Sequence, residues 1–593
     1  MATFQPNTSE LSLVYGPTDK PLWETTLGNF LNEQVQKFGD KTAVAFPWQN
    51  VQFTYKNLAE RSLIVARGLL AHNLKPGDFV GIFAGNRYEY LEVFLGASQI
   101  GCPVVVLNNT YTPQELVRAL SQSSCKLLFI STSLKDKSFN EHIHLVLGNT
   151  KDTRVLSELQ IVTFGPPRAD LRTARLQSYE TFTGTHPTPL ERQRIKRAGS
   201  HVCPSDVVNL QFTSGTTGAP KAAMLTHRNI LNNAHHVGIR LALTPHSTLC
   251  CPPPLFHCFG LVMGFLAALA HGSAIVFPSE TFDAGRTLAV LRAWGCDVLL
   301  GVPTMFLAEL EGLRHEQGGN RGEEEEEKNK NKNKKKGLRV RAALAAGSPV
   351  PGPLVGRLER EMGVRSVVVA YGMTETSPVS FMTEDGEQQV PGAVGTVMPH
   401  MRAKVVDRTG RVVPRGTRGE LCTSGYALMK GYFGNAEATR EVMRVDEEGT
   451  VWMHTGDECV IDEKGVCHIT GRIKDIIIRG GENIFPAEIE ERLLAHAMVA
   501  EACVVGIRDE KYGEVVGCFL RPVRHGEKAG TVALQEWVRE SLGRHKAPQW
   551  VFWIGDPAVG DDFPKTASGK HQKHILRKLG NRLVSQVTVK PRL

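Results

Sequence analysis

The sequence lacks paired cysteines, a long apolar segment and an apolar leader. None of its 12 Cys residues forms a Cys-x-x-Cys pair, and Cys250-Cys251 is the one close pair, which favours a reduced compartment over a disulfide framework. The start, MATFQPNTSE, has neither a basic nor an apolar region, so we expect no secretory signal. The longest apolar run, from Cys258 to Ala270, is shorter than the ~20 residues that a spanning helix needs. We therefore expect no transmembrane segment.

The chain also lacks a basic stripe interleaved with aromatic residues, a pattern typical of nucleic-acid binding. Its formal net charge is +8, from 69 basic and 61 acidic residues, and part of this excess lies in one Lys/Asn run. A mildly basic surface suits small phosphorylated ligands as well as polyanions. We expect small-molecule ligands and no nucleic-acid partner.

Helical and strand-like pieces alternate along much of the chain. Between Phe53 and Val106, LAERSLIVARGLLAHNL has an amphipathic helical pattern, DFVGIFAG a buried-strand pattern and EYLEVFLGASQIG a second helical pattern. Apolar runs that end in Gly or small residues recur farther along, as in VRSVVVAYG. The sequence therefore predicts an α/β protein whose large N-terminal domain consists of parallel or mixed sheets covered by helices.

Two changes in composition divide the chain. Residues 318–337 (GGNRGEEEEEKNKNKNKKKG) cannot bury apolar area, so we expect a disordered surface insertion whose apolar flanks join across it. After Gly471 the pattern changes to the short strand, turn and helix signals of a small module. We predict an N-terminal domain over 1–471, a hinge over 472–475 and a small mobile C-terminal α+β domain over 476–593.

A loop rich in hydroxyl groups follows the strand-like segment VVNLQF. Its glycines allow close backbone approach, its hydroxyl groups can bind phosphate oxygens and its lysine supplies a cation, so the loop is suited to hold a polyphosphate. It does not fit the G-x-x-x-x-G-K-[ST] pattern, and a Ser/Thr/Gly surface turn is the alternative. The predicted phosphate loop comprises Thr213, Ser214, Gly215, Thr216, Thr217, Gly218, Ala219, Pro220 and Lys221.

This nine-residue loop closely resembles the signature of the adenylate-forming superfamily, which includes acyl-CoA synthetases, luciferases and the adenylation domains of peptide synthetases. Further motifs resemble that superfamily in the expected order, over roughly residues 25 to 580. The segment from Ala370 to Glu375 is similar to its Y-G-x-T-E motif. The resemblance implies that Tyr371 contacts the adenine, that Thr374 binds phosphate, and that Glu375 binds Mg²⁺, a cation that prefers oxygen ligands.

Two other motifs carry expected nucleotide contacts. Gly347 and Ser348 resemble the superfamily's turn beside the adenine, and by the same resemblance Gly347 and Gly372 border the acid substrate. The run from Trp452 to Asp457 is similar to W-x-x-T-G-D, which implies that Asp457 accepts hydrogen bonds from both ribose hydroxyls. Taken alone, each motif is also compatible with an ordinary turn.

The predicted hinge resembles the superfamily's hinge. The resemblance implies that Arg472 contacts the ribose, and that the backbone of Lys474 changes conformation when the small domain rotates. Gly480 and Gly481 resemble the segment that approaches the CoA thiol after that rotation. A surface Arg/Lys pair is the alternative for the hinge residues.

The segment PKTASGK, which ends at Lys570, resembles the superfamily's P-K-T-x-x-G-K motif, and this makes Lys570 the expected catalytic lysine. Attack of a carboxylate on the α-phosphate joins two anions, so a cation between them lowers their repulsion. A basic C-terminal tail is the alternative, and it explains Lys573 better than Lys570. One departure from the superfamily pattern is Ala222, where Gly is usual after the loop lysine; its methyl group is tolerable if the local φ is negative.

His257 occupies the position where amino-acid-activating adenylation domains usually have Asp, so we expect a carboxylic acid without an ammonium group, contacted by His257. The following GLVMGFLAALA is apolar, as an acyl channel or a core helix would be. A carrier-protein domain with its phosphopantetheine-accepting Ser motif is not apparent in the 23 residues after Lys570, so we expect CoA as the acceptor. The resemblance is greatest to medium-chain acyl-CoA synthetases and to fungal peroxisomal acyl-CoA ligases of secondary metabolism. It implies ATP, Mg²⁺ and CoA as cofactor and co-substrates, with a fatty or hydroxy acid as substrate.

Two alternatives are kept beside this hypothesis. One is an acyl-adenylate ligase that delivers its product to a carrier protein, and the other is an inactive nucleotide-binding homologue. The final tripeptide, Pro591-Arg592-Leu593, resembles a degenerate S-K-L peroxisomal address. We therefore expect a peroxisomal import receptor as partner, and a cytoplasmic location if the tripeptide is inactive.

Overall fold

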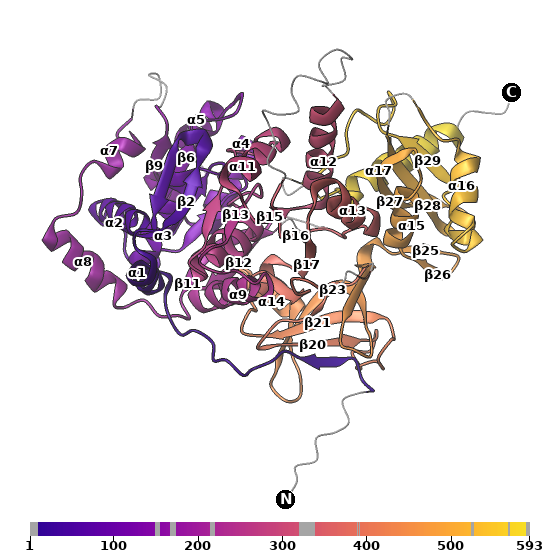
Figure 1. Cartoon of the computed structure of the whole chain (residues 1–593), viewed down its shortest axis with the longest axis horizontal. Coiled ribbons are helices and arrows are strands. Elements are labelled where there is room, and N and C mark those ends of the chain that lie inside the picture. Colours follow the sequence, from indigo (N-terminus) through magenta and orange to yellow (C-terminus); the bar gives the residue numbers. More distant parts are fainter. Residues whose placement is uncertain are drawn as a thin grey trace, which may run out of the picture.

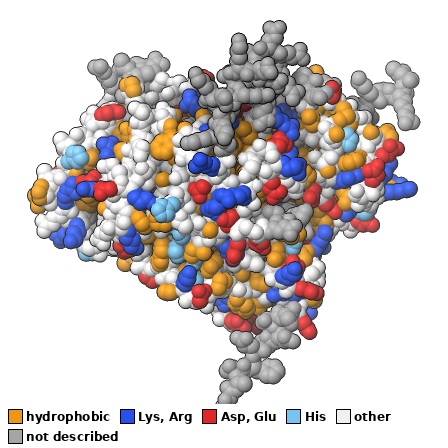
Figure 2. All heavy atoms as spheres, viewed as in Figure 1, with side chains coloured by type: hydrophobic (Ala, Val, Ile, Leu, Met, Phe, Trp, Pro, Cys, Tyr) orange, Lys and Arg blue, Asp and Glu red, His pale blue; other side chains and the backbone are white. Residues whose placement is uncertain are grey.

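The computed structural model describes most of the chain and places it in four large sheets (Figure 1). The described residues are 10–148, 154–166, 173–213, 220–318, 338–387, 390, 392–523, 527–566 and 570–588. Acidic and basic side chains are interspersed over the face in Figure 2. Within the described residues, no helix has the length and apolar character required to cross a bilayer.

The first sheet has seven strands in the order β10-β9-β6-β4-β5-β11-β12. It is parallel except for its last pair, β11 and β12. Such parallel pairing follows from the predicted alternation, because helices connect successive strands. Its strands are β4 (Val80–Phe83), β5 (Val104–Val106), β6 (Leu127–Ser131), β9 (Gln160–Phe164), β10 (Leu176–Ser178), β11 (Val207–Thr213) and β12 (Lys221–Thr226).

The second sheet has nine strands in the order β19-β18-β17-β16-β15-β13-β14-β2-β3. Its centre is parallel and its two edges are antiparallel. Its strands are β2 (Thr42–Phe46), β3 (Val51–Thr54), β13 (Thr248–Cys250), β14 (Ala274–Val276), β15 (Val298–Gly301), β16 (Ala342–Ala346), β17 (Ser366–Gly372), β18 (Val379–Met382) and β19 (Thr396–Val397).

Helices cover both sheets and bury two apolar clusters, one large and one smaller. The helix α2 has an amphipathic sequence and starts at a capping box formed by Thr54 and Asn57. A π-helix, Phe259–Leu266, carries the predicted channel sequence and is buried throughout. The principal helices are α1 (Leu27–Phe38), α2 (Tyr55–Ala71), α3 (Tyr88–Gln99), α4 (Pro113–Ser123), α8 (Pro189–Gly199), α9 (His227–Arg240), α11 (Ala284–Trp294), α12 (Pro303–Gly318) and α13 (Gly352–Arg357).

The predicted insertion falls between α12 and β16. Apart from Gly318, the last residue of α12, it lies outside the described residues. Its flanks belong to one crossover, because β15 and β16 are parallel neighbours with Val298 opposite Ala342.

The third sheet follows the nine-stranded one in the chain and has six strands, β1-β20-β21-β23-β22 with β24 beside β23. It is antiparallel, and along most of its longest strand, β23, buried and half-buried side chains alternate. Its strands are β1 (Leu13–Tyr15), β20 (Met401–Val406), β21 (Gly419–Gly425), β22 (Met443–Val445), β23 (Val451–Ile461) and β24 (Cys467–Arg472).

A fourth, five-stranded sheet forms the C-terminal unit, drawn in yellow at one end of Figure 1. Helices pack on it around its own apolar clusters. Its elements are β25 (Ile477–Arg479), β26 (Glu482–Ile484), α15 (Pro486–Leu494), β27 (Val499–Asp509), β28 (Gly513–Pro522), α16 (Thr531–Arg539), β29 (Trp550–Trp553) and α17 (Lys573–Thr588). The predicted fold class, a large α/β part with a small C-terminal α+β part, is confirmed.

Candidate active site

Two predicted motifs meet at one edge of the nine-stranded sheet. The strands β16 and β17 are parallel, with Ala346 opposite Ala370, so Gly347 and Tyr371 lie next to each other at their carboxyl ends. Ligands of open α/β sheets bind at this edge, beyond the carboxyl ends of the strands. Gly347 has φ +90°, a conformation that suits glycine, and Ser348 follows it half-buried.

Asp457 is the acceptor at the centre of this edge and is only 6% exposed. Its Oδ2 accepts a hydrogen bond from the Tyr371 hydroxyl at 2.7 Å, and its Oδ1 lies 3.1 Å from Nε of Arg472. Burial and the charge of Asp457 raise the pKa of Tyr371 well above its ordinary value, so this phenol stays a donor. Three side chains from three predicted motifs are therefore in direct contact.

Glu375 lies beside the same edge in a short 3-10 helix, Thr374–Thr376, directly after the half-buried Thr374. It is 5% exposed, and its Oε1 accepts a hydrogen bond from Tyr432 at 2.7 Å. The ring of Tyr432 in turn lies 5.2 Å below Nζ of Lys221, the last residue of the predicted phosphate loop. Tyr432 thus connects the loop lysine to the acidic residue.

Residues 214–219 of the predicted phosphate loop lie outside the described residues. The two ends of the loop are held together, since Thr213 and Lys221 are strand partners and Thr213 Oγ1 donates to the Lys221 carbonyl at 3.3 Å. The exposed Pro220 precedes this pair. Ala222 is buried, pairs with Phe212 in the ladder and does not have a positive φ, so its methyl group is accommodated.

Lys570 reaches the edge from the C-terminal unit. A Cβ placed on Gly347 would lie 3.8 Å from Cε of Lys570. Burial lowers the pKa of Lys570, and so does the charge of Arg472, while Asp457 and Glu375 act in the opposite direction. A residue far downstream in the sequence therefore shares one electrostatic environment with three residues of the predicted site.

His257 faces the same lysine and is half-buried. Burial, and to a smaller degree the charge of Lys570, lowers the pKa of His257 to about 4, so the imidazole is neutral at physiological pH. Its Nδ1 accepts the Phe259 backbone N–H at 3.2 Å, which orients the ring at the start of the π-helix. His257 is thus bonded to the first residue of the π-helix and lies within the electrostatic range of Lys570.

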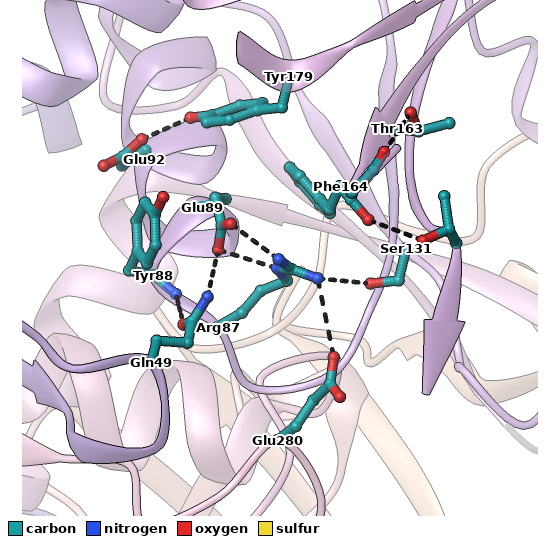
Figure 3. Close-up of polar contacts among 12 residues, drawn as sticks. Gln49, Arg87, Tyr88, Glu89, Glu92, Ser131, Thr163, Phe164, Tyr179 and Glu280 are labelled. Carbon is teal, nitrogen blue, oxygen red and sulfur yellow. Dashed lines mark hydrogen bonds and ion pairs between the residues drawn. The ribbon is translucent and has the colours of Figure 1, made fainter. Parts of the chain in front are cut away.

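A buried polar network supports the loop that carries His257. Asn86 accepts the Leu255 N–H at 2.8 Å and donates to the Pro253 carbonyl at 3.1 Å. The next residue, Arg87, is 13% exposed and forms two hydrogen bonds with Glu89, at 2.8 and 2.9 Å (Figure 3). This bidentate ion pair is a strong form of hydrogen bonding and holds the connection between β4 and α3 that bears Asn86.

The predicted hinge lies between the third and fourth sheets. Arg472 ends β24, and Lys474 is exposed in the 3-10 helix Ile473–Asp475. Gly480 and Gly481 form the turn between β25 and β26, where the Gly480 N–H donates to the Tyr512 carbonyl at 2.7 Å. Among the described residues, a Cβ on Gly480 would meet Tyr512 alone within 4 Å and one on Gly481 would meet no atom, so neither glycine contacts the described residues of the cluster around Lys570.

One group of three potential metal-binding side chains is present among the described residues, and it consists of Glu420, Cys422 and His454. Glu375 is not part of such a group. Mg²⁺ is commonly bound through one or two carboxylates together with substrate phosphates and water, so a single buried carboxylate beside the phosphate loop fits that ion.

Several contributing residues were missed by the sequence analysis. Tyr432, Asn86 and Glu420 lie in segments without a distinctive local pattern, and only the fold brings them to the site. The predicted tripeptide Pro591-Arg592-Leu593 lies outside the described residues.

Comparison with known proteins gives two family matches. The AMP-binding enzyme family model matches residues 31–433, and the model of the AMP-binding enzyme C-terminal domain matches residues 488–570. Among curated proteins, the chain is 44% identical over 574 residues to the acyl-CoA ligase sidI of Aspergillus fumigatus, covering 96% of this chain and 93% of that protein. It is 32% identical over 587 residues to the mitochondrial medium-chain acyl-CoA ligase ACSF2 of Danio rerio, covering 95% of this chain and 90% of that protein.

Solved structures share the fold, among them these two. The anthranilate CoA ligase AuaEII in complex with anthranoyl-AMP matches with a TM-score of 0.80 at 22% identity, covering 96% of this chain and 99% of that one. The ATP-bound MatB of Rhodopseudomonas palustris matches with a TM-score of 0.74 at 25% identity, covering 94% and 100%.

Proposed function

Since the chain belongs to the AMP-binding enzyme family and is an AMP-forming acid-CoA ligase, we propose that the cluster around Asp457 and Lys570 carries out its adenylation step. The observation that supports this most is the placement of Lys570. Its Cε lies beside Gly347, at the strand edge that also holds Tyr371 and Glu375.

In the first half-reaction, a carboxylate oxygen of the acid forms a bond to the α-phosphorus of ATP as the bond to pyrophosphate breaks. Both reactants are anions, and the ammonium group of Lys570 lowers their repulsion and stabilises the charge that develops between them. Burial and the charge of Arg472 lower the pKa of Lys570, and the neighbouring Asp457 and Glu375 carboxylates oppose that shift, so they favour the charged form that this role requires.

The nucleotide is held by the residues of the edge. Asp457 accepts hydrogen bonds from the ribose, Tyr371 contacts the adenine, and the loop from Thr213 to Lys221 surrounds the phosphates together with Thr374. Glu375 would hold Mg²⁺, which offsets phosphate charge when it is bound.

In the second half-reaction, the CoA thiolate attacks the acyl carbonyl and the bond to AMP breaks. We assign this step to a rotated arrangement of residues 476–593 about Lys474, in which Gly480 and Gly481 replace Lys570 at the cluster. The exposure of Lys474 between two separate sheets supports a hinge at 472–475, because an exposed connection can change its dihedral angles without disturbing a core.

The acid lies against His257 and the apolar π-helix. A neutral imidazole and an apolar wall suit a fatty or hydroxy acid and disfavour one that carries an ammonium group. For location we propose the peroxisome, through Pro591-Arg592-Leu593; removal of this tripeptide from a fluorescent fusion should abolish a punctate distribution.

The proposal is tested by pyrophosphate release with a panel of acetate, medium-chain and long-chain fatty acids, aryl acids and hydroxy acids. We expect release only with ATP and an accepted acid, followed by AMP and thioester formation on addition of CoA. An acyl-adenylate that accumulates regardless of CoA would favour delivery to a carrier protein. The absence of pyrophosphate exchange with every acid would favour an inactive homologue and would sink the proposal.

A further inference from the structure

Asp457 stands on a β-bulge of unusual width. In the pairing of β21 with β23, Glu420 lies opposite Glu458 and Cys422 lies opposite His454. Between these pairs, the three residues Thr455 to Asp457 face the single residue Leu421. Bulges of this kind redirect side chains and leave backbone groups without ladder partners. The direction of Asp457 is therefore set by whatever holds the bulge.

Glu420 holds the centre of the bulge. Its Oε1 accepts the backbone N–H of Gly456 at 3.2 Å, and its Oε2 lies 2.8 Å from Nδ1 of His454. Gly456 has φ +70°, a conformation that favours glycine and that turns its N–H out of the ladder toward this carboxylate. The side chain of Glu420 on β21 thus accepts the backbone N–H of Gly456, directly before Asp457. It also contacts His454, three positions before Asp457.

A second contact ties the bulge to β21. Thr455 Oγ1 donates to the Leu421 carbonyl at 2.8 Å and accepts the Asp457 N–H at 3.1 Å. The backbone of Asp457 is therefore fixed through Thr455, while its carboxylate meets Tyr371 and Arg472. Apart from Thr455, the side chain that holds the bulge to β21 is the carboxylate of Glu420.

The hydrogen bonds also account for the grouping of Glu420, Cys422 and His454 without a metal ion. Both oxygens of Glu420 are engaged, and Cys422 Sγ lies 3.4 Å from Nδ1 of His454. Burial opposes ionisation of Glu420, but the hydrogen bond and charge of His454 outweigh it and lower the pKa of the carboxyl. The carboxylate is thus charged when it binds the Gly456 N–H, which strengthens that bond.

We propose that Glu420 is a positioning residue that aims Asp457 at the ribose, and that it thereby sets the preference of the enzyme for a nucleotide with both ribose hydroxyls. The proposal rests on the role of Asp457 given under the proposed function. It makes Glu420 a determinant of nucleotide specificity although it does not touch the nucleotide.

The test compares kcat/KM for ATP with kcat/KM for 2′-deoxy-ATP in pyrophosphate release. The ratio of kcat/KM for ATP to kcat/KM for 2′-deoxy-ATP is independent of the fraction of active enzyme, because both nucleotides are measured in one preparation. We expect E420A to lower the ratio about tenfold, the size of a lost charged hydrogen bond. E420Q should retain most of it, because the amide oxygen can still accept the Gly456 N–H. The matched control is E463A, which removes an exposed carboxylate from the β23–β24 turn.

D457A separates failure of this proposal from failure of the proposed function. If D457A leaves the ratio unchanged, Asp457 does not recognise the ribose and the proposed function itself is wrong at this residue. If D457A abolishes the preference while E420A keeps the ratio of E463A, the positioning role is overturned. Should E420A fail to fold, E420D is used, whose shorter side chain cannot reach both partners; a ratio lower than that of E420Q supports the proposal, and an equal ratio overturns it.

Discussion

The two lysines Lys570 and Lys573 lie three positions apart and serve two different regions of the molecule. Lys570 faces the strand edge of the nine-stranded sheet, where burial and the nearby Arg472 lower its pKa. Lys573 faces the C-terminal sheet, where Nζ lies 2.7 Å from Oε1 of Glu490 and this carboxylate raises its pKa against the effect of burial. One basic segment therefore presents one cation to the proposed site and another to the C-terminal sheet.

The anchoring region is built around Glu501 on β27. Its carboxylate lies 2.5 Å from Nζ of Lys565, 2.9 Å from Nε2 of His571 and 3.1 Å from Nε of Arg521. Lys565 and His571 flank Lys570 on both sides and are bridged to each other in the backbone. The comparison teaches that Lys570 can face the strand edge near Gly347 because its neighbours on either side are tied to the C-terminal sheet.

The largest effect is expected from K570A, which removes the cation of the chemical region. Loss of one group that stabilises transition-state charge typically lowers kcat by about 10²- to 10³-fold. We expect that loss in pyrophosphate exchange, and a change of no more than a few-fold in thioester formation from supplied acyl-adenylate and CoA. The control is K578M, which removes an exposed lysine from α17. Equal loss in both half-reactions would refute the assignment of Lys570.

A smaller effect is expected from E501Q, which weakens the contacts of Glu501 with Lys565 and His571 but keeps the side chain of Lys570. Burial raises the pKa of Glu501, but the hydrogen bond from His571 and the charge of Lys565 outweigh it and lower the pKa from 4.5 to about 2. That difference corresponds to roughly 3 kcal/mol of stability, which is an upper value for a partly solvated carboxylate. The free energy of unfolding in urea measures it, with E463Q as the exposed-carboxylate control.

For E501Q, the change in unfolding free energy should also depend on pH in a defined direction. A carboxyl whose pKa is lower in the folded state stabilises the protein above its unfolded pKa, and this stability is lost as pH falls toward the folded value. The gap in unfolding free energy between the wild type and E501Q should therefore be constant from pH 7 to about 5.5 and shrink below about pH 4.5. A gap that widens on acidification would contradict the anchoring role of Glu501.

Much of the fold could be predicted from the sequence, because the period of apolar residues determines which faces are buried. The alternation between Phe53 and Val106 became α2, β4, α3 and β5, and the pattern change after Gly471 coincides with the start of the fourth sheet. The sequence could not show that β16 and β17 are neighbours, nor that β11 and β12 lie at the edge of a different sheet. Such pairing depends on contacts between distant segments, which local periodicity does not encode.

The residues of the candidate site also fall into those that the sequence indicated and those that it did not. Residues with a chemical reason for their spacing, such as Tyr371, Asp457 and Lys570, were found from the motifs that resemble the superfamily. Residues that act through other residues, such as Tyr432 and Glu420, were not found, since neither a tyrosine in a connecting segment nor a glutamate in a strand has a local signature of its partner. The structure is needed for them because each contact joins segments more than 30 residues apart.

The smallest effect on the free energy of unfolding is expected from K573M, which removes the cation paired with Glu490 in the C-terminal unit. This change does not leave the Glu490 carboxylate without a hydrogen bond. Glu490 keeps a hydrogen bond, because the Val504 N–H donates to its Oε1 at 2.7 Å. The side chains of Lys573 and Glu490 are 22% and 16% exposed, so the loss of unfolding free energy should be about 1–2 kcal/mol, between the values for exposed and buried ion pairs.

Because the pKa of Lys573 is raised, this stability is fully present below the ordinary lysine pKa, and the difference in unfolding free energy between K573M and the wild type should stay constant from pH 6 to 9. Pyrophosphate exchange per folded molecule should stay within about twofold of the wild type, as expected for a cation that does not face the reacting anions. An adenylation defect in K573M as large as that of K570A would show that the two lysines form one functional unit, and the contrast between the two regions would then be wrong.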